Sequence, residues 1–105
     1  MAEGNREPML LRVEVVVKEI KGRCPLYKVG DKFVVDGYYI SSEESCNVCL
    51  HALGALLTLL TLLSHGHPPE EMGIGKEGKA YLTCPDPGPP CTEGGSVLFE
   101  LRVKP

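Results

Sequence analysis

The fold is decided by the stretch Cys46-Asn47-Val48-Cys49-Leu50-His51-Ala52-Leu53-Gly54-Ala55-Leu56-Leu57-Thr58-Leu59-Leu60-Thr61-Leu62-Leu63, the chain's only long apolar segment. We expect one helix over roughly residues 45–65. The Ser and Glu side chains of residues 41–45 can cap free backbone N–H groups at its start. Gly66 can adopt a left-handed C-cap conformation, and Pro68-Pro69 prevent the helix from continuing.

The predicted helix is apolar almost all the way round. Its polar residues form one thin stripe made of His51, Thr58, Thr61 and His65. Such a pattern is typical of a helix buried in a protein core. The apolar run is also shorter than the roughly 20 residues that span a membrane. We therefore expect a core helix and no membrane association.

Working outward from the helix, several segments have strand-like patterns. Residues 9–20 alternate apolar and polar side chains and are rich in β-branched residues, as a half-buried strand requires. Asp36-Gly37 is a hairpin signal between two further short strands. The predicted strands are residues 9–20, 32–35, 38–40, 79–83 and 96–103.

These segments predict an α+β fold, in which a small, largely antiparallel sheet of about five strands packs on one long apolar helix. The remaining apolar sides of the helix also need cover. Either the sheet curls around the helix or a second subunit packs there, so a homodimer is possible. We expect one domain over residues 9–105, preceded by a flexible N-terminus over residues 1–8.

Composition narrows the class of protein. The chain has 105 residues, a formal charge of −3 and an isoelectric point near 5.6. This acidic balance argues against a nucleic-acid partner, which usually requires a basic face. The first eight residues have no apolar core of a signal peptide, so the sequence favours a cytoplasmic location.

The chain has five cysteines, an uneven count, and the expected compartment is reducing. Both points favour metal ligation, thiol chemistry or plain burial over a disulfide framework. All of them fall where regular structure is expected to stop. Rigid prolines stand beside three of them, an arrangement that suits a site assembled from separate loops. The cysteines are Cys24, Cys46, Cys49, Cys84 and Cys91.

Three interpretations of the thiols remain open. A tetrahedral zinc or iron site needs three or four thiolates, and Cys46-x-x-Cys49 is the usual half of one. Cys84 and Cys91 are too far apart in sequence to form the second half of a zinc ribbon. His51, His65 and His67 could add a ligand, although His51 is expected to point almost opposite to Cys49 on a helix and is the poorest candidate.

The redox interpretation uses the same Cys-x-x-Cys pair, because the dipole of a helix N-terminus stabilises a thiolate. Against it, the strand order does not match a thioredoxin fold. The third interpretation is that these cysteines are core residues, since free cysteine is among the most buried residue types.

A set of motifs resembles a family of small bacterial and archaeal proteins of unassigned function. The shared pattern consists of a Gly-x-Cys-Pro turn, a Gly-Asp-x-Phe strand, a Cys that opens an apolar helix, a Cys-Pro-Asp turn and a closing strand. The corresponding residues here are Gly22-Arg23-Cys24-Pro25, Gly30-Asp31-Lys32-Phe33, Cys49-Leu50-His51-Ala52-Leu53, Cys84-Pro85-Asp86 and Val97-Leu98-Phe99-Glu100-Leu101. The resemblance covers roughly residues 10–103 and implies no particular activity.

The resemblance does rank the thiols. Cys24, Cys49 and Cys84 fall on the pattern, whereas Cys46 and Cys91 are additions in this sequence. The first three are the expected core of any shared site, with a fourth position open to water, a substrate or another cysteine. Cys46 and Cys91 are possible additional ligands or a disulfide pair.

The leading hypothesis is a metal-binding domain in which Cys24, Cys49 and Cys84 converge near the helix start on zinc or iron. The alternative is a non-catalytic homo-oligomeric interaction module with buried or disulfide-bonded cysteines, and the third is a thiol oxidoreductase. No general base with an orienting partner is recognisable in the sequence, so no reaction is assigned and the question of an enzyme stays open.

Overall fold

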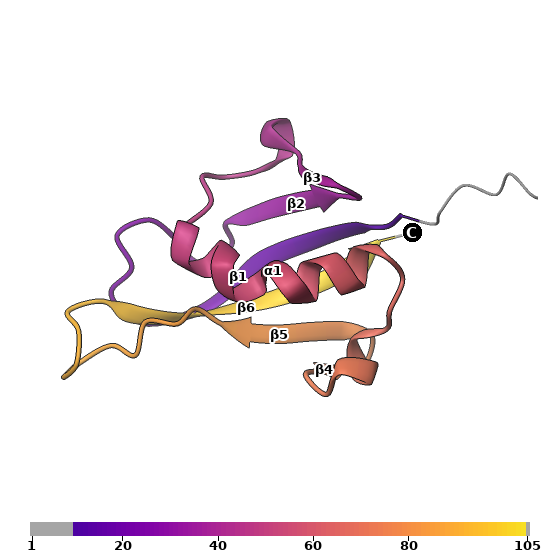
Figure 1. Cartoon of the computed structure of the whole chain (residues 1–105). Coiled ribbons are helices and arrows are strands. Elements are labelled where there is room, and N and C mark those ends of the chain that lie inside the picture. The colour runs from indigo at the N-terminus through magenta and orange to yellow at the C-terminus, as the bar shows by residue number, and fades with distance from the viewer. Residues whose placement is uncertain (1–9, 105) are drawn as a thin grey trace, which may run out of the picture.

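A computed structural model describes residues 10–104 of the chain. The predicted flexible segment 1–8 lies outside the described residues. Within them, one helix lies on one face of a six-stranded antiparallel sheet (Figure 1). The prediction of an α+β fold with an antiparallel sheet is therefore confirmed.

The sheet has the order β3-β2-β1-β6-β5-β4. Its strands are β1 (Arg12–Gly22), β2 (Lys32–Asp36), β3 (Tyr39–Ile40), β4 (Gly75–Lys76), β5 (Lys79–Thr83) and β6 (Gly95–Lys104). The helix is α1 (Leu50–Ser64), and two short 3-10 turns are η1 (Ser42–Glu44) and η2 (Pro69–Met72).

The sheet has six strands where about five were predicted, because β4 forms in a segment rich in glycine and proline. β4 pairs with β5 across a two-residue turn, Glu77-Gly78. Both turn residues have positive φ, 55° and 81°, which is the backbone of a tight hairpin turn. The β2–β3 turn is also displaced by one residue from its predicted position, since Asp36 pairs with Tyr39 and the turn consists of Gly37-Tyr38.

The long strands β1 and β6 form the centre of the sheet and carry its core. Val13, Val15 and Val17 lie opposite Val103, Leu101 and Phe99, respectively. The predicted alternation in β1 therefore holds, with the valines at odd positions buried. A bulge between Val17 and Glu19 interrupts this register near the end of the sheet where the pocket described below lies.

Helix α1 is shorter than predicted and begins at Leu50 instead of residue 45. The preceding segment is held extended beside β2, because the Cys46 N–H donates to the carbonyl of Lys32 at 2.9 Å. Ser45 does not serve as the expected helix cap, since its hydroxyl accepts a 2.9 Å bond from the N–H of Val34. Cys49 thus becomes the N-cap residue, and Gly66 (φ 93°) follows the helix end as predicted.

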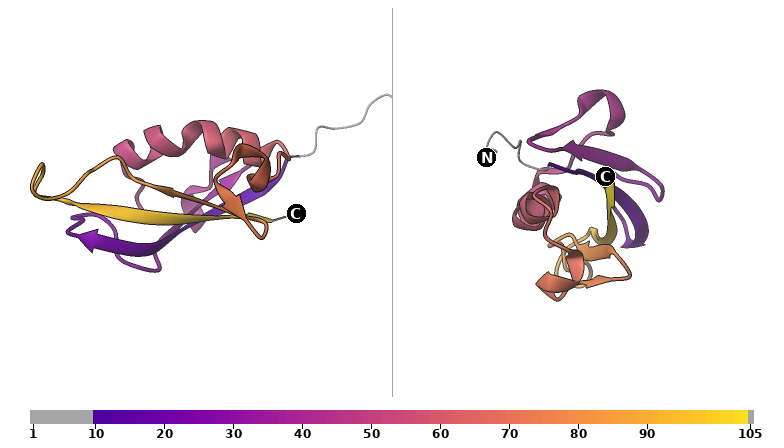
Figure 2. Two further views of the ribbon diagram at one scale, coloured as in Figure 1. Left: turned by 90° about the horizontal axis from the view of Figure 1, so that it is seen from below. Right: turned by 90° about the vertical axis from the view of Figure 1, so that its right-hand side faces the viewer.

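The prediction of a helix buried all round is wrong. Leu56 and Leu63 are fully buried, but Leu50 is 80% exposed and Leu57 is 55% exposed. The sheet curves partly around the helix and leaves its outer side uncovered (Figure 2). Within residues 10–104, no helix is long and apolar enough to cross a membrane.

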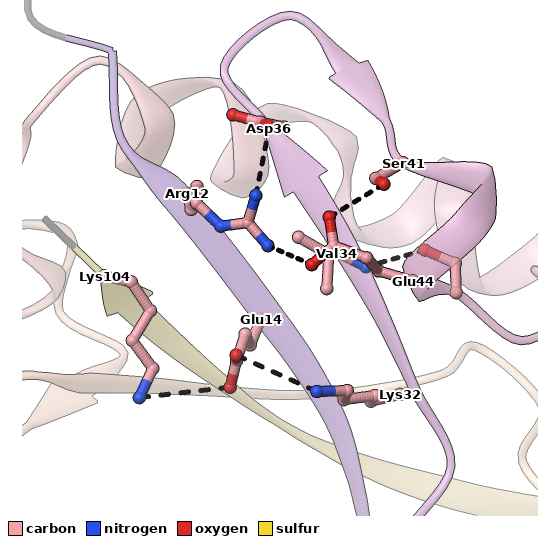
Figure 3. Close-up of polar contacts among 9 residues, drawn as sticks. Arg12, Glu14, Lys32, Val34, Asp36, Ser41, Glu44 and Lys104 are labelled. Atoms are coloured by element: carbon pink, nitrogen blue, oxygen red, sulfur yellow. Dashed lines mark hydrogen bonds and ion pairs between the residues drawn. The ribbon is translucent and has the colours of Figure 1, made fainter.

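The sheet face opposite α1 carries paired charges. Figure 3 shows Arg12 between Asp36 and Glu44, and Glu14 between Lys32 and Lys104. On the same face, the carboxylate of Glu100 is 1% exposed and contacts cations from three strand positions, which are Lys18, Lys79 and Arg102. These ion pairs give the charged side chains on this face of the sheet partners of opposite sign, and the apolar core lies on the other face.

Candidate thiol pocket

Three segments that are distant in sequence meet at one end of the sheet. They are the loop after β1, the start of α1 and the proline-rich loop between β5 and β6 (Figure 1). They enclose a pocket of about 320 Å³. Its lining includes Cys24, Cys49 and Cys84, together with Tyr27 and His51.

The Cys24 segment is positioned by close backbone contact between β1 and β6. Gly22 has φ 88°, and a Cβ at Gly95 would lie only 2.2 Å from the carbonyl oxygen of Lys21. Glycines are therefore required where these two strands approach each other. Beyond this point Cys24-Pro25 turns the chain, and the N–H of Tyr27 donates to the Sγ atom of Cys24 at 3.3 Å.

Tyr27 joins this loop to the helix start. Its ring packs edge-on against Phe99, with the ring centroids 5.6 Å apart. Its hydroxyl oxygen accepts a 2.8 Å hydrogen bond from the N–H of Cys49, the N-cap residue. Burial raises the pKa of Tyr27, against the opposing effect of its hydrogen bond with the Cys49 backbone, and the nearby thiols of Cys46, Cys49 and Cys24 add smaller contributions that raise it. Tyr27 therefore stays a neutral hydroxyl at neutral pH.

Cys84 is fixed by its pairing with the start of β6. Its N–H donates to the carbonyl of Val97 at 2.9 Å, and its Sγ accepts the N–H of Val97 at 3.3 Å. The same sulfur lies 3.7 Å from the carbonyl oxygen of Gly95, to which a protonated thiol can donate. Two of the three pocket sulfurs, those of Cys24 and Cys84, thus receive a backbone N–H.

The proline-rich loop is organised by Asp86. Its carboxylate accepts bonds from the Thr92 hydroxyl and, at 2.9 Å, from the N–H of Gly88. These bonds lower the pKa of Asp86, with a smaller contribution from His51. Asp86 and His51 both line the pocket, so they form a polar part of its rim.

The position of His51 corrects an inference from the sequence. A helix starting at residue 45 would turn His51 away from Cys49, which made it the poorest candidate for a ligand. Since α1 begins at Leu50, the exposed His51 lies in the first turn and lines the same pocket as Cys49. His65 and His67 lie at the other end of α1, where His67 pairs with Glu71.

The two remaining cysteines lie outside the lining of the pocket within residues 10–104. Cys46 is partly buried against the core, and burial together with Asp31 raises the pKa of its thiol. Cys91 is exposed at the far end of the proline-rich loop. All five cysteines fall in the described part of the chain and are free thiols in this structure, including Cys46 and Cys91, which the sequence offered as possible additional ligands or a disulfide pair.

The pocket does not hold a ready-made site for a single ion. Among the described residues, no three His, Cys, Asp or Glu side chains are grouped so that they could hold a metal ion. Cys24, Cys49 and Cys84 thus share one pocket without surrounding one point. Chemically, the pocket combines soft thiols with a neutral phenol, an imidazole and backbone N–H donors.

Comparison with known proteins adds no relative. No protein-family model, no curated protein and no solved structure matches this chain. The resemblance to a small bacterial and archaeal family therefore stays a prediction.

Proposed function

We propose that this protein is a small metal-binding domain in which Cys24, Cys49 and Cys84 hold a soft transition metal, zinc or iron. The observation that supports the proposal is the lining of the pocket. Three segments separated by the sheet and the helix each contribute one free cysteine to it. Thiolates are the preferred ligands of zinc and of iron–sulfur centres.

Binding requires the three sulfurs to move toward the metal. Each side chain can change its χ1 rotamer, and the pocket volume of about 320 Å³ leaves room for this movement. Each thiol loses its proton on ligation, so affinity should fall as the pH is lowered. A reducing cytoplasm, the location predicted from the sequence, would keep the thiols available.

The test is metal analysis of protein purified anaerobically and then exposed separately to zinc and to ferrous iron. We expect near-stoichiometric metal that raises the midpoint of thermal unfolding and is removed by a chelator. Cys24→Ser, Cys49→Ser and Cys84→Ser should each reduce the bound metal, whereas the exposed Cys91→Ser serves as the matched control. Wild-type protein that retains no metal after exposure would contradict the proposal.

A second candidate function, a homo-oligomeric interaction module, is favoured by the exposed apolar side of α1. A groove of about 450 Å³ runs between α1 and the β2–β3 hairpin. Leu57 and Tyr39, which are 55% and 59% exposed, line it with Tyr38, which is 77% exposed. The proposed occupant is a second copy of the chain.

This candidate is tested by the mass in solution over a range of protein concentrations. We expect a dimer that Leu57→Glu dissociates, while Thr58→Glu, an exposed neighbour outside the groove lining, is the matched control. A monomeric mass at all concentrations would contradict it. The result is independent of metal binding, because no residue lines both the groove and the thiol pocket.

A further inference from the structure

We propose that the sheet face opposite α1 binds a small phosphate monoester with a hydroxylated body, such as a phosphorylated polyol. The phosphate group lies on the cations around Glu100, and the hydroxylated body lies in a neighbouring hollow on the same face. This site shares no lining residue with the thiol pocket or with the groove beside α1. The inference therefore depends neither on metal binding nor on a dimer.

The first argument is the unequal charge around Glu100. The cation cluster consists of Lys18, Lys79 and Arg102, which come from β1, β5 and β6, respectively. All three cationic groups lie within 3.8 Å of the single carboxylate of Glu100. Three cations and one carboxylate leave two positive charges in excess, although the formal charge of the whole chain is −3. The acidic net charge therefore does not describe this part of the surface.

The second argument is the depth of these charges. The Glu100 side chain is only 2% exposed, whereas the side chains of the cation cluster are about half-exposed. Hydrogen bonding from Arg102 lowers the pKa of Glu100 to about 2, so the carboxylate stays ionised at neutral pH and keeps the cations gathered around it. The negative charge thus lies beneath the positive charges, and an anion that approaches from solvent meets the cations first.

The third argument is the match with a phosphate group. Arg102 bonds Glu100 through Nε, so its two terminal nitrogens can donate to a ligand, as a guanidinium does in bidentate phosphate recognition. The Lys79 ammonium lies 3.8 Å from the carboxylate, beyond ordinary hydrogen-bond length, and can also donate to a ligand. A phosphate monoester has a charge of about −1.5 to −2 at neutral pH and three acceptor oxygens. It can therefore balance the two excess charges, whereas a carboxylate balances only one.

The fourth argument is a hollow of about 110 Å³ beside the cation cluster. The Thr83–Leu98 pair at the hollow is two residues along β5 and β6 from the pair that contains Glu100, or about 7 Å away on the same face. Four of the five lining side chains carry hydroxyl, ammonium or carboxylate groups, which can hydrogen-bond a hydroxylated body. The lining consists of Glu19, Lys21, Thr83, Ser96 and Leu98.

The test is titration of the full wild-type chain with glycerol phosphate in a phosphate-free buffer, followed by the amide chemical shifts in nuclear magnetic resonance. We expect saturable one-to-one binding, with the largest shifts at Thr83, Ser96 and Leu98. Inorganic phosphate should bind more weakly, because it contacts the cation cluster alone, and glycerol should not bind. The absence of saturable shifts with glycerol phosphate would overturn the site.

Two lysines of this face provide a matched pair of variants. Lys79 and Lys32 are 47% and 50% exposed, and each lies at the edge of ion-pair range of a glutamate, at 3.8 and 3.9 Å. Lys32 pairs with Glu14, away from the cation cluster (Figure 3). Lys79→Gln should weaken the binding of glycerol phosphate roughly tenfold, as expected for one lost hydrogen bond between charged groups, and Lys32→Gln should have little effect. Equal weakening by both would indicate long-range attraction and overturn a local site.

A variant in the hollow tests where the body of the ligand lies. Thr83 is exposed, and Thr83→Val removes its hydroxyl while it keeps a β-branched residue in β5. The change should weaken the binding of glycerol phosphate and leave the binding of inorganic phosphate as in wild type. Unchanged binding of glycerol phosphate would overturn the placement of the body in the hollow.

Competition experiments test the class of ligand. Single-stranded DNA and an acidic peptide without phosphate are each added to the wild-type chain in complex with glycerol phosphate. We expect neither to displace the ligand at equal concentration. Displacement by the DNA would indicate a nucleic-acid surface and displacement by the peptide a docking surface for an acidic protein, and either result would overturn the proposal.

Discussion

Tyr27 is the residue on which the geometry of the thiol pocket depends most directly. It comes from the Cys24 loop, packs on Phe99 of β6 and bonds the backbone of Cys49 at the helix start. No local sequence pattern predicts this role, because Phe99 and Cys49, the residues that Tyr27 contacts, are distant from it in the chain. The motifs do select Cys24, Cys49 and Cys84, but the positions of Tyr27 and His51 follow only from tertiary packing and from the true start of α1.

Removal of the Tyr27 hydroxyl should leave the buried ring in place and the N–H of Cys49 without its partner. We expect Tyr27→Phe to lower the free energy of unfolding by about 0.5–1.5 kcal/mol, the usual net contribution of one hydrogen bond, because the N–H of Cys49 is only partly buried. Urea denaturation measures the change. The exposed Tyr38→Phe is the matched control and should have almost no effect. Equal effects of the two substitutions would show that the bond to Cys49 contributes little.

Glu100 is the residue whose charge should be most visible in the pH dependence of stability. Hydrogen bonding from Arg102 and then from Lys18 lowers the pKa of Glu100 from 4.5 to about 2, against the opposing effect of burial. A carboxylate with a lowered pKa in the folded state stabilises the protein above its unfolded-state pKa. That stabilisation is lost as the pH falls from about 4.5 toward about 2.

Comparison of wild type with Glu100→Gln isolates this contribution. The variant should be less stable by about 1.5–3 kcal/mol at neutral pH, the range for hydrogen bonds to charged groups. The difference in unfolding free energy should shrink as the pH is lowered through that window. Glu14, on the same face but with longer ion pairs of 3.9 and 4.0 Å, is the control position. A difference that is constant with pH would mean that the Glu100 charge does not stabilise the fold.

At the scale of elements, the helix shows what hydrophobic pattern can and cannot predict. Its existence and its end follow from the sequence of residues 50–66. Its start does not, because Ser45 and Cys46 bond to β2 and hold the chain extended before Leu50. Its exposed side also could not be predicted, since apolar Leu50 and Leu57 face outward with no local sign of it. The short strand β4 depends on a two-residue turn that overrides a poor strand propensity.

Two adjacent leucines of α1 test which side of the helix faces the core and which side is exposed. Leu56 is fully buried and Leu57 is 55% exposed. Leu56→Ala should cost about 2–5 kcal/mol because it leaves a cavity in the core. Leu57→Ala should change stability by less than about 0.5 kcal/mol in the monomer. Chemical denaturation at low protein concentration measures both, and a large effect at Leu57 alone would contradict the orientation of the helix.

At the scale of the whole molecule, the thiol pocket exists because β1 and β6 approach closely at the end of the sheet. The antiparallel register brings Gly22 opposite Gly95, and the loops that carry Cys24 and Cys84 leave from this point. The sequence predicts both strands, and it predicts that Cys24 and Cys84 lie where regular structure stops. It does not predict this register, which is determined by the shared core face and by the bulge after Val17.

Gly95→Ala should therefore disturb the fold and the pocket together. The added Cβ would lie 2.2 Å from the carbonyl oxygen of Lys21 and 2.5 Å from the backbone nitrogen of Arg23, so the two strand ends must separate. We expect a loss of about 1–3 kcal/mol of unfolding free energy, as for other overpacked sites, and weaker metal binding.

Gly54→Ala is the opposite control, because a Cβ there meets nothing within 4 Å among the described residues. In the interior of α1 that change should stabilise the protein by roughly 0.5–1 kcal/mol and leave metal binding unchanged. Thermal unfolding with and without metal distinguishes the two variants; a Gly95→Ala protein that binds metal as wild type does would show that the pocket tolerates separation of the strands.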